Sequence, residues 1–407
     1  MQKQHNNKIY YFDFQSTTPM DKRVIEEIYN SMKEDYGNPH STSHPIGWKA
    51  IEKVELARYK IAKLINAETD EIIFTSGATE SNNLAIKGAT HFYKNKGKHI
   101  ITMSVEHKCV LESCRFLQTE GYEITYIDPE EDGLLDLKKL KNSIRNNTIL
   151  ISIMGVNNET GVIQNLKEIG KIAHENNILF HTDCAQAYGK IPLDVKSMNI
   201  DLMSISSHKI YGPKGIGALY VRKKPKVHLS PIIHGGGQEK GLRSGTLSVP
   251  LCVGFGKAAE ICSKEMQKDW KRISKLSDYF LSKILTIEDA YLNGNRKHKI
   301  PGCNNISFLH IEGESLMLAI QNFCISTGSA CNSANLQPSY VISNMRKSSY
   351  YAHSAMRIGF GRTTTKKEVD LLINALTKAV KHLRSISPLW EMKKQGIDIN
   401  SINWDKD

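Results

Sequence analysis

Long hydrophobic runs are missing from this sequence of 407 residues. No run approaches the roughly 20 apolar residues that a membrane-spanning helix needs. The first eight residues are polar and lack the apolar region of a secretory signal. They are also too short, and too poor in arginine, to be an intact mitochondrial transit peptide. We therefore expect a cytoplasmic protein, or else the processed form of an organellar one.

Paired cysteine motifs are missing as well. The eight cysteines are irregularly spaced and include no Cys-x-x-Cys pair. This pattern indicates reduced thiols in a reducing compartment. His181 and Cys184 are spaced like metal ligands, but no second pair completes a zinc site, so no resident metal is expected.

Clusters of basic residues are absent, although the formal net charge is +12. Lysine and arginine are scattered along the chain, and no nucleic-acid-binding signature accompanies them. Direct binding of nucleic acid is therefore not expected. An acidic protein partner fits the excess charge better, and the alternative is a solvated basic surface without a partner.

Short apolar runs alternate with windows of helical spacing between about residues 71 and 221. This alternation predicts an α/β fold with a mostly parallel sheet that helices cover on both faces. The expected strands are residues 71–74, 99–102, 148–153, 178–181, 202–205 and 218–221. Such sheets place ligand-binding groups at the carboxyl ends of their strands.

The pattern changes near Pro250. A long helical pattern runs from there to about Leu285, and further strands and helices then mix. The expected elements are strands at 305–309 and 356–360 and helices at 313–323 and 366–383. We expect a large domain over residues 15–262 and a smaller α+β domain formed by residues 1–14 and 263–407.

Cys331 lies in the segment STGSACNSA (326–334), among small residues, and Pro338 follows. Small residues let a loop move and let backbone approach a ligand. A thiol on such a loop suits the delivery of sulfur between two places. The alternative is a buried structural cysteine, but apolar partners for it are missing on both sides.

Lys209 carries a second signal, because His208 and Lys209 end a predicted strand just before the run Gly-Pro-Lys-Gly. A lysine held there can form a Schiff base with a carbonyl cofactor, although most lysines are merely solvated. Pyridoxal phosphate would also need an acidic partner for its ring nitrogen, donors for its phosphate and a group against its ring.

Each of these needs has a candidate. Asp183 ends an apolar strand, the segment TSGATES (75–81) joins a strand to a helix, and His107 follows another strand. They suit the ring nitrogen, the phosphate and the ring face respectively. Each also has an ordinary structural alternative: a turn aspartate, a helix N-cap or a packed histidine.

In combination these motifs resemble those of the group I cysteine desulfurases, fold-type I enzymes that use pyridoxal phosphate. The resemblance covers residues 11–404. It rests on TSGATESNN (75–83), EHK (106–108), VNNE (156–159), HTD (181–183) with Gln186, residues 206–217, RSGT (243–246), the Cys331 loop and SPLWEM (387–392). The motifs GNPHS (37–41) and EHKC (106–109) are most similar to the mitochondrial and alphaproteobacterial branch.

The resemblance implies a role for each site residue. Cys331 is the implied nucleophile, Lys209 bonds covalently to the cofactor, and His107 stacks on its ring and moves protons. The implied cofactor-binding residues are Ala78, Thr79, Asn158, Asp183, Gln186, Ser206, His208, Lys209 and, from a neighbouring subunit, Thr246. Asn38 and Arg357 are implied to bind the substrate carboxylate. No metal is implied, except that Cys331 would transiently ligate an iron–sulfur cluster together with a scaffold protein.

The implied reaction converts L-cysteine to L-alanine and leaves a persulfide on Cys331, which supplies iron–sulfur cluster assembly and tRNA thiolation. The implied partners are a second copy of the chain, the iron–sulfur scaffold, and frataxin-like, ferredoxin and sulfur-carrier proteins, with no membrane. The implied location is the bacterial cytoplasm or, alternatively, a mitochondrial or mitosomal matrix. The tail after Pro388 is predicted to dock the scaffold; the alternative is a tail folded back on its own domain.

Two other functions stay open. One is a different pyridoxal phosphate enzyme, such as an aminotransferase or a selenocysteine lyase, which the Cys331 loop disfavours. The other is a non-catalytic assembly subunit, which the intact Lys209, His107 and Asp183 disfavour. The sequence departs from the family pattern at Cys184, Ser207, Asn332, residues 341–346 and Thr363, none of them catalytic.

Overall fold

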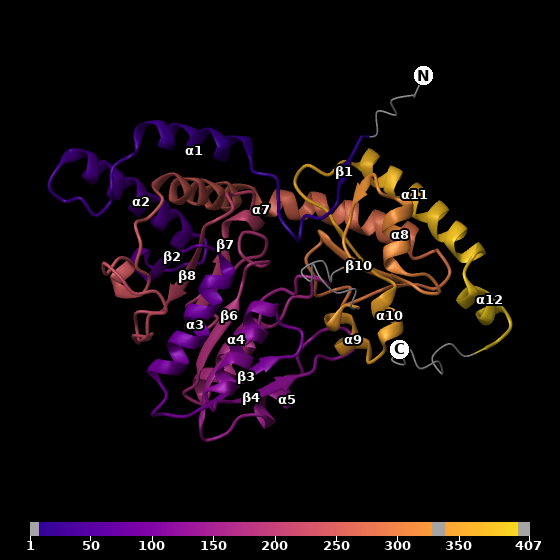
Figure 1. Cartoon of the computed structure of the whole chain (residues 1–407), viewed down its shortest axis with the longest axis horizontal. Coiled ribbons are helices and arrows are strands. Elements are labelled where there is room, and N and C mark those ends of the chain that lie inside the picture. Colours follow the sequence, from indigo (N-terminus) through magenta and orange to yellow (C-terminus); the bar gives the residue numbers. More distant parts are fainter. Residues whose placement is uncertain (1–7, 328–337, 398–407) are drawn as a thin grey trace.

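The computed structural model describes residues 8–327 and 338–397. A seven-stranded sheet with the order β2-β8-β7-β6-β5-β3-β4 forms the centre of its larger half (Figure 1). The strands are β2 (Ile72–Thr75), β3 (His99–Met103), β4 (Glu123–Ile127), β5 (Thr148–Ser152), β6 (Leu179–Asp183), β7 (Leu202–Ser206) and β8 (Gly217–Val221). Only β8 runs against its neighbours, so the prediction of a mostly parallel α/β sheet is confirmed.

The strands are apolar without alternation because helices cover both faces of the sheet. Every residue of β2, β3, β5, β7 and β8 is buried. The helices of this half are α1 (Lys22–Glu34), α2 (Pro45–Lys63), α3 (Ala78–Phe92), α4 (Lys108–Thr119), α5 (Leu137–Asn142) and α6 (Leu166–Glu175), together with the first part of the long helix described below. All strands except β8 point the same way, so their carboxyl ends meet at one edge.

The smaller half contains an antiparallel sheet with the order β12-β10-β9, which fits the expected α+β pattern. Its strands are β9 (Ala290–Leu292), β10 (Cys303–Phe308) and β12 (Ala355–Gly359), and its helices are α8 (Gly313–Ala319), α9 (Tyr340–Arg346), α10 (Ser349–His353), α11 (Lys366–Ser385) and α12 (Pro388–Lys394). A separate core that includes Phe280, Phe308, Met356 and Leu372 holds it together.

One predicted helix is shorter than expected. The helix predicted at 313–323 ends at Ala319, and Phe323–Cys324 form a short strand, β11, instead. This strand pairs in parallel with β1 (Tyr10–Tyr11), more than 300 residues earlier in the chain. Local periodicity cannot show such a pairing, because its partner is remote in sequence.

Helix α7 (Val249–Ile284) connects the two halves. Its first part packs against α1 and α2, while Phe280 and Ile284 belong to the core of the smaller half. The expected domain boundary at residue 262 therefore lies inside a continuous helix. No helix among the described residues, α7 included, is both long and apolar enough to cross a membrane.

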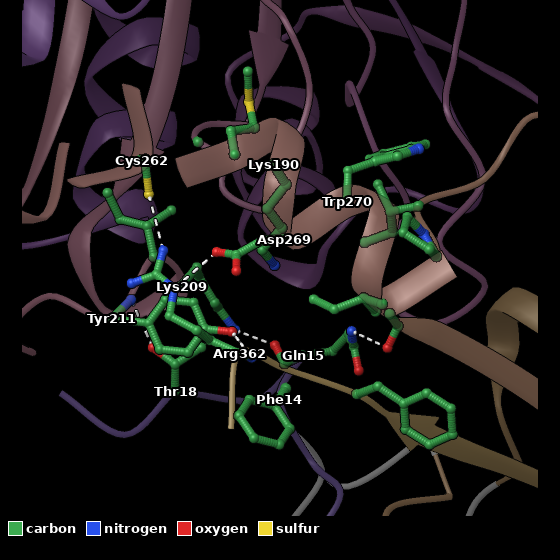
Figure 2. A pocket seen from close by; sticks show the side chains of 18 residues that line it. Phe14, Gln15, Thr18, Lys190, Lys209, Tyr211, Cys262, Asp269, Trp270 and Arg362 are labelled. Atoms are coloured by element: carbon green, nitrogen blue, oxygen red, sulfur yellow. Dashed lines mark hydrogen bonds and ion pairs between the residues drawn. The ribbon is translucent and has the colours of Figure 1, made fainter. Parts of the chain in front are cut away.

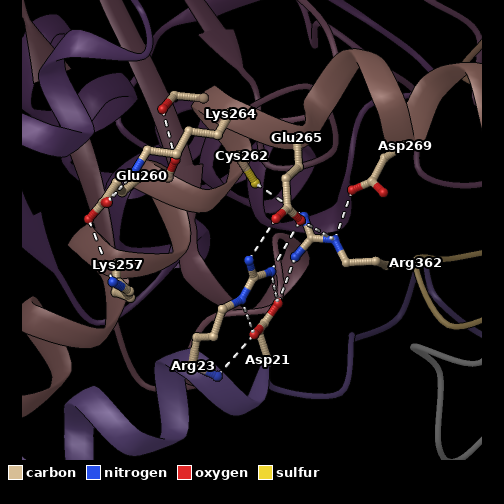
Figure 3. Close-up of polar contacts among 10 residues, drawn as sticks. Asp21, Arg23, Lys257, Glu260, Cys262, Lys264, Glu265, Asp269 and Arg362 are labelled. Atoms are coloured by element: carbon tan, nitrogen blue, oxygen red, sulfur yellow. Dashed lines mark hydrogen bonds and ion pairs between the residues drawn. The ribbon is translucent and has the colours of Figure 1, made fainter.

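An ion-pair network ties the start of α1 to α7 and to the segment after β12 (Figure 3). Arg362 bonds Asp21 Oδ2 at 3.0 Å and Asp269 Oδ2 at 2.8 Å. Arg23 reaches Glu265 Oε1 at 2.6 Å. The network anchors the chain directly after the N-terminal segment 13–18, and this segment contacts the site described next.

Candidate active site

A cavity of about 440 Å³ lies at the edge where the carboxyl ends of the strands meet. The carboxyl ends of β2, β3, β5, β6 and β7 contribute to it, as expected for a sheet of this kind. The sequence-predicted residues that line it are Ala78, Thr79, His107, Asn158, Asp183, Gln186, Ser206, His208, Lys209 and Arg357. Folding thus brings ten predicted residues into one cavity.

Three predicted residues are not among its lining. Asn38 and Thr246 are exposed elsewhere on the same chain, and Asn38 Oδ1 accepts the backbone N–H of His40 at 2.9 Å. Thr246 was expected to serve the site of a neighbouring subunit. Cys331 lies outside the described residues.

Lys209 is held by the N-terminal segment. It ends the 3-10 helix η2 (Ser207–Lys209), which directly follows β7. Its Nζ donates hydrogen bonds to the backbone carbonyl oxygens of Gln15 at 2.5 Å and Ser16 at 2.7 Å. Two backbone carbonyls of the N-terminal segment therefore hold the amine in the lining of the cavity.

Asp183, the last residue of β6, is buried with both carboxylate oxygens engaged. Asn82 Nδ2 donates to its Oδ2 at 2.7 Å, and the backbone N–H of Ala185 donates to Oδ1 at 2.9 Å. Asn82 belongs to the motif TSGATESNN (75–83), but the sequence alone indicates no role for it. A buried carboxylate held in this way suits pairing with a protonated ring nitrogen.

His107 is the N-cap of α4, so its ring orientation follows from the start of that helix. Its Nδ1 accepts the backbone N–H of Cys109 at 3.3 Å and lies 3.0 Å from Cys109 Sγ. Burial lowers the pKa of His107, and this outweighs the opposing charge of Asp183. Since Nδ1 accepts, the neutral ring carries its proton on Nε2.

The turn before α3 has the properties of an anion site. Gly77 has φ 156° and ψ 179°, a conformation that suits glycine. The first N–H groups of α3 have no helical partner and favour a phosphate. Glu80 fixes the turn, since it accepts Ser76 N–H at 2.8 Å and pairs with Arg243 at 2.8 Å.

His208 also lines the cavity. Its Nδ1 lies 3.0 Å from Thr17 Oγ1. Burial, followed by the charges of Lys209 and Lys214, lowers the pKa of His208 to about 4. A neutral imidazole at this position can donate a hydrogen bond without adding charge.

Arg357 enters from the smaller half, on β12. Its Nη2 bonds Asp13 Oδ1 at 2.9 Å and Ser16 Oγ at 2.5 Å, and its Nη1 bonds the carbonyl oxygen of Asn158 at 3.1 Å. The guanidinium is suited to bind a carboxylate at two points. Sequence reasoning missed Asp13, because no motif surrounds it.

Residues 10–372 match the model of the family described as aminotransferase class-V. This chain belongs to the class-V aminotransferase family. It is 55% identical over 394 residues to the mitochondrial cysteine desulfurase of Saccharomyces cerevisiae, covering 97% of this chain and 79% of that protein. It is 56% identical over 395 residues to the cysteine desulfurase IscS of Rickettsia peacockii, covering 97% and 96%.

Solved structures agree with this assignment. A NifS-like protein superimposes with a TM-score of 0.85 at 35% identity, covering 92% of this chain and 100% of that one. A structure described as SspA in complex with cysteine gives 0.78 at 39% identity, covering 88% and 100%. This chain is therefore grouped with the cysteine desulfurases of the class-V family, and its cofactor is pyridoxal phosphate.

The cavity of this class-V enzyme fits that cofactor on independent grounds. Asn158 Oδ1 is buried and has no hydrogen-bond partner within residues 8–327 and 338–397. Buried polar atoms rarely stay unpaired, so a bound group is expected to supply a donor. With Asp183, the α3 N-terminus and Lys209 in the same cavity, each polar part of pyridoxal phosphate has a partner.

Proposed function

We propose that this chain converts L-cysteine to L-alanine and retains the released sulfur as a persulfide on Cys331. One observation carries the proposal: Lys209, His107 and Asp183 share a single cavity with Arg357, in a chain grouped with the cysteine desulfurases. The sulfur-accepting role of Cys331 comes from the sequence, since that residue lies outside the described part of the chain.

The start of the Cys331 loop supports this role. Ser326 and Arg357 exchange backbone hydrogen bonds, from Ser326 N–H to Arg357 at 3.2 Å and from Arg357 N–H to Ser326 at 2.6 Å. Cys331 is five residues beyond Ser326, and five extended residues reach at most about 17 Å. The loop therefore starts beside the proposed substrate-binding arginine and is long enough to bring a thiol into the cavity.

Each residue then has a task. Arg357 binds the substrate carboxylate, and Asp183 holds the protonated ring nitrogen in place. When bound, pyridoxal phosphate supplies the electron sink that stabilises negative charge at the substrate Cα. Lys209 and His107 Nε2 hold and move protons beside that carbon.

The sulfur step balances without a further reactant. The Cys331 thiolate attacks the substrate sulfur, so an S–S bond forms and the substrate Cβ–S bond breaks. The electron pair stays with the substrate carbon, which takes up a proton and leaves as alanine. One cysteine and one enzyme thiol thus give one alanine and one enzyme persulfide.

We also propose that the persulfide supplies an iron–sulfur scaffold and, as a second destination, tRNA thiolation. Proposed partners are frataxin-like, ferredoxin and sulfur-carrier proteins, and a second copy of this chain. The exposed position of Thr246, away from its own cavity, supports a role in a second subunit. Similarity to both bacterial and mitochondrial desulfurases supports a bacterial cytoplasm or an organellar matrix.

The test is to incubate the purified holoenzyme with L-cysteine and a thiol reductant and to measure alanine and sulfide together. Equal amounts of both are expected. Cys331→Ser should keep the cofactor spectrum but form no persulfide, because a serine hydroxyl stays protonated. Normal sulfide release by Cys331→Ser would rule out the nucleophile, and amino transfer to a keto acid without alanine release would indicate an aminotransferase.

A further inference from the structure

A second lysine lies behind Lys209. Lys190 and Lys209 both line a second cavity, of about 60 Å³ (Figure 2). Gln15 also lines both cavities, whereas Lys190 is not part of the cofactor site's lining. Although Lys190 as a whole is partly exposed, its ammonium group is buried. Lys190 therefore stands one layer behind the residues that face the cofactor.

The buried ammonium is directed at an amide, not at a carboxylate. Lys190 Nζ donates to Gln186 Oε1 at 2.7 Å. In the described part of the chain Lys190 makes no ion pair, and Asp269, which lines the same cavity, is paired with Arg362. Burying a charge without a counter-ion is costly, so a lysine kept here is expected to have a task.

A continuous chain of hydrogen bonds leads from Lys190 to Lys209. Gln186 Nε2 donates to the backbone carbonyl oxygen of Gln15 at 2.8 Å, and the same oxygen accepts Lys209 Nζ at 2.5 Å. A lysine only donates and a carbonyl only accepts. The two ends of the Gln186 amide are therefore fixed: its oxygen must face Lys190 and its nitrogen must face Gln15.

We propose that Lys190 is a positioning residue for the cofactor site, which fixes the Gln186 amide of that site and, through it, the carbonyl that receives the free Lys209 amine before the cofactor is attached. Without Lys190, Gln186 Oε1 loses its buried donor. If the Gln186 amide rotated, its oxygen would face the carbonyl oxygen of Gln15, and the two acceptors would repel each other. Burial, followed by the charge of Lys209, lowers the pKa of Lys190 to about 7. Both protonation states of Lys190 keep N–H donors, so its hydrogen bond to Gln186 Oε1 persists on either side of neutral pH.

The test is the visible spectrum and the cofactor affinity of the holoenzyme variant Lys190→Met, which keeps the stem and removes the donor. We expect a shifted absorption maximum and about tenfold weaker cofactor binding, from the loss of a buried hydrogen bond. This inference rests on the cofactor and not on the proposed sulfur chemistry, so its readout needs no turnover of cysteine.

Lys299→Met is the matched control. Lys299 is also a buried lysine, its Nζ donates to Asn304 Oδ1 at 3.0 Å, and burial lowers its pKa to about 8, but it does not line the cofactor cavity. Lys299→Met should leave the spectrum and the affinity unchanged. Equal effects of the two variants would show general destabilisation and overturn the proposal, and so would an unchanged Lys190→Met.

A double variant decides whether Lys190 acts through Gln186. Gln186→Leu alone should shift the spectrum in the same direction as Lys190→Met, which keeps the proposal testable if Lys190→Met does not fold. Lys190→Met should then add nothing in the Gln186→Leu background, because coupled residues are not additive. If Lys190→Met had its full effect in the Gln186→Leu background, Lys190 would not act through Gln186, and the proposal would be wrong.

Discussion

The two walls of the active-site cavity are built in different ways. The wall from the larger half consists of residues at the carboxyl ends of parallel strands, each next to a recognisable motif, such as Asp183 at the end of β6 and Lys209 just after β7. The opposite wall depends on Arg357, which lies within β12 and is held by Asp13, 344 residues earlier. The first wall is specified locally and the second by contacts between remote segments. We expect changes in the first wall to impair chemistry and changes in the second to impair substrate binding.

The largest expected effect is that of Lys209→Ala, which removes the covalent attachment point of the first wall. The variant should lose the visible absorbance of the attached cofactor, and turnover should fall by about 10³-fold or more, as for other lost proton-transfer groups. Absorbance and alanine production measure the two effects. Full activity with an unchanged spectrum would show that the lysine is assigned wrongly.

Arg357→Lys tests the second wall. Lysine keeps the charge but cannot bind a carboxylate at two points, so KM for cysteine should rise about 10- to 100-fold with a smaller change in kcat. The matched control is Arg384→Lys, since Arg384 is also buried, bonds the carbonyl oxygens of Glu288 and Leu309, and does not line the cavity. A rise in KM with the control, or a pure loss of kcat in Arg357→Lys, would contradict the division between the walls.

Asn82→Ala tests how the first wall holds its carboxylate. The variant leaves Asp183 with one donor fewer, so cofactor affinity should fall about tenfold. Asn83→Ala is the neighbouring control, because Asn83 Nδ2 donates to the carbonyl oxygen of Thr79 on the exposed side of α3. Equilibrium dialysis of the cofactor measures the affinity of both variants. Equal affinities would show that Asn82 does not support cofactor binding.

His181 tests how burial in the first wall makes the stability of the protein depend on pH. Burial in β6 lowers the pKa of His181 from 6.5 to about 3. Below pH 6.5 the unfolded chain binds a proton there while the folded chain does not, so stability is lost as the pH falls, by about 1.4 kcal/mol per unit. Urea unfolding of wild type and His181→Gln between pH 6.5 and pH 5 should show a shallower pH dependence in the variant. Parallel curves would mean that His181 is protonated in the folded enzyme.

The smallest expected effect on turnover is that of deleting residues 398–407, the part of the predicted docking tail outside the described residues. Trp390 at its base is folded back, with its ring 5.1 Å from that of His310 and 4.6 Å from the Arg384 guanidinium. The deletion spares this packing, so alanine production with a chemical reductant should stay constant while sulfur transfer to a scaffold protein weakens. Equal loss of both activities would make the tail structural.

Much of the first wall could be predicted from the sequence alone. Continuous apolar strands gave the parallel sheet, and the residues after each strand gave Asp183, His107 and Lys209, because parallel strands deliver their carboxyl ends to one edge. The motifs around these residues are contiguous, so the resemblance to the desulfurases could also be found without coordinates.

The tertiary structure decided what depends on remote pairing. Local sequence carries no sign that Asp13 meets Arg357, that Gln15 and Ser16 receive Lys209, or that Lys190 stands behind Gln186. Asp13, Gln15 and Ser16 lie in the N-terminal segment, which reaches the site only because the chain on either side is fixed: β1 pairs with β11 before it, and Asp21 bonds Arg362 after it. Such contacts form when the whole chain has folded, since their energies depend on burial between segments and not on local propensity. The sequence thus determined which chemical groups are present, and the packing of the two halves decided which of them hold one another in place.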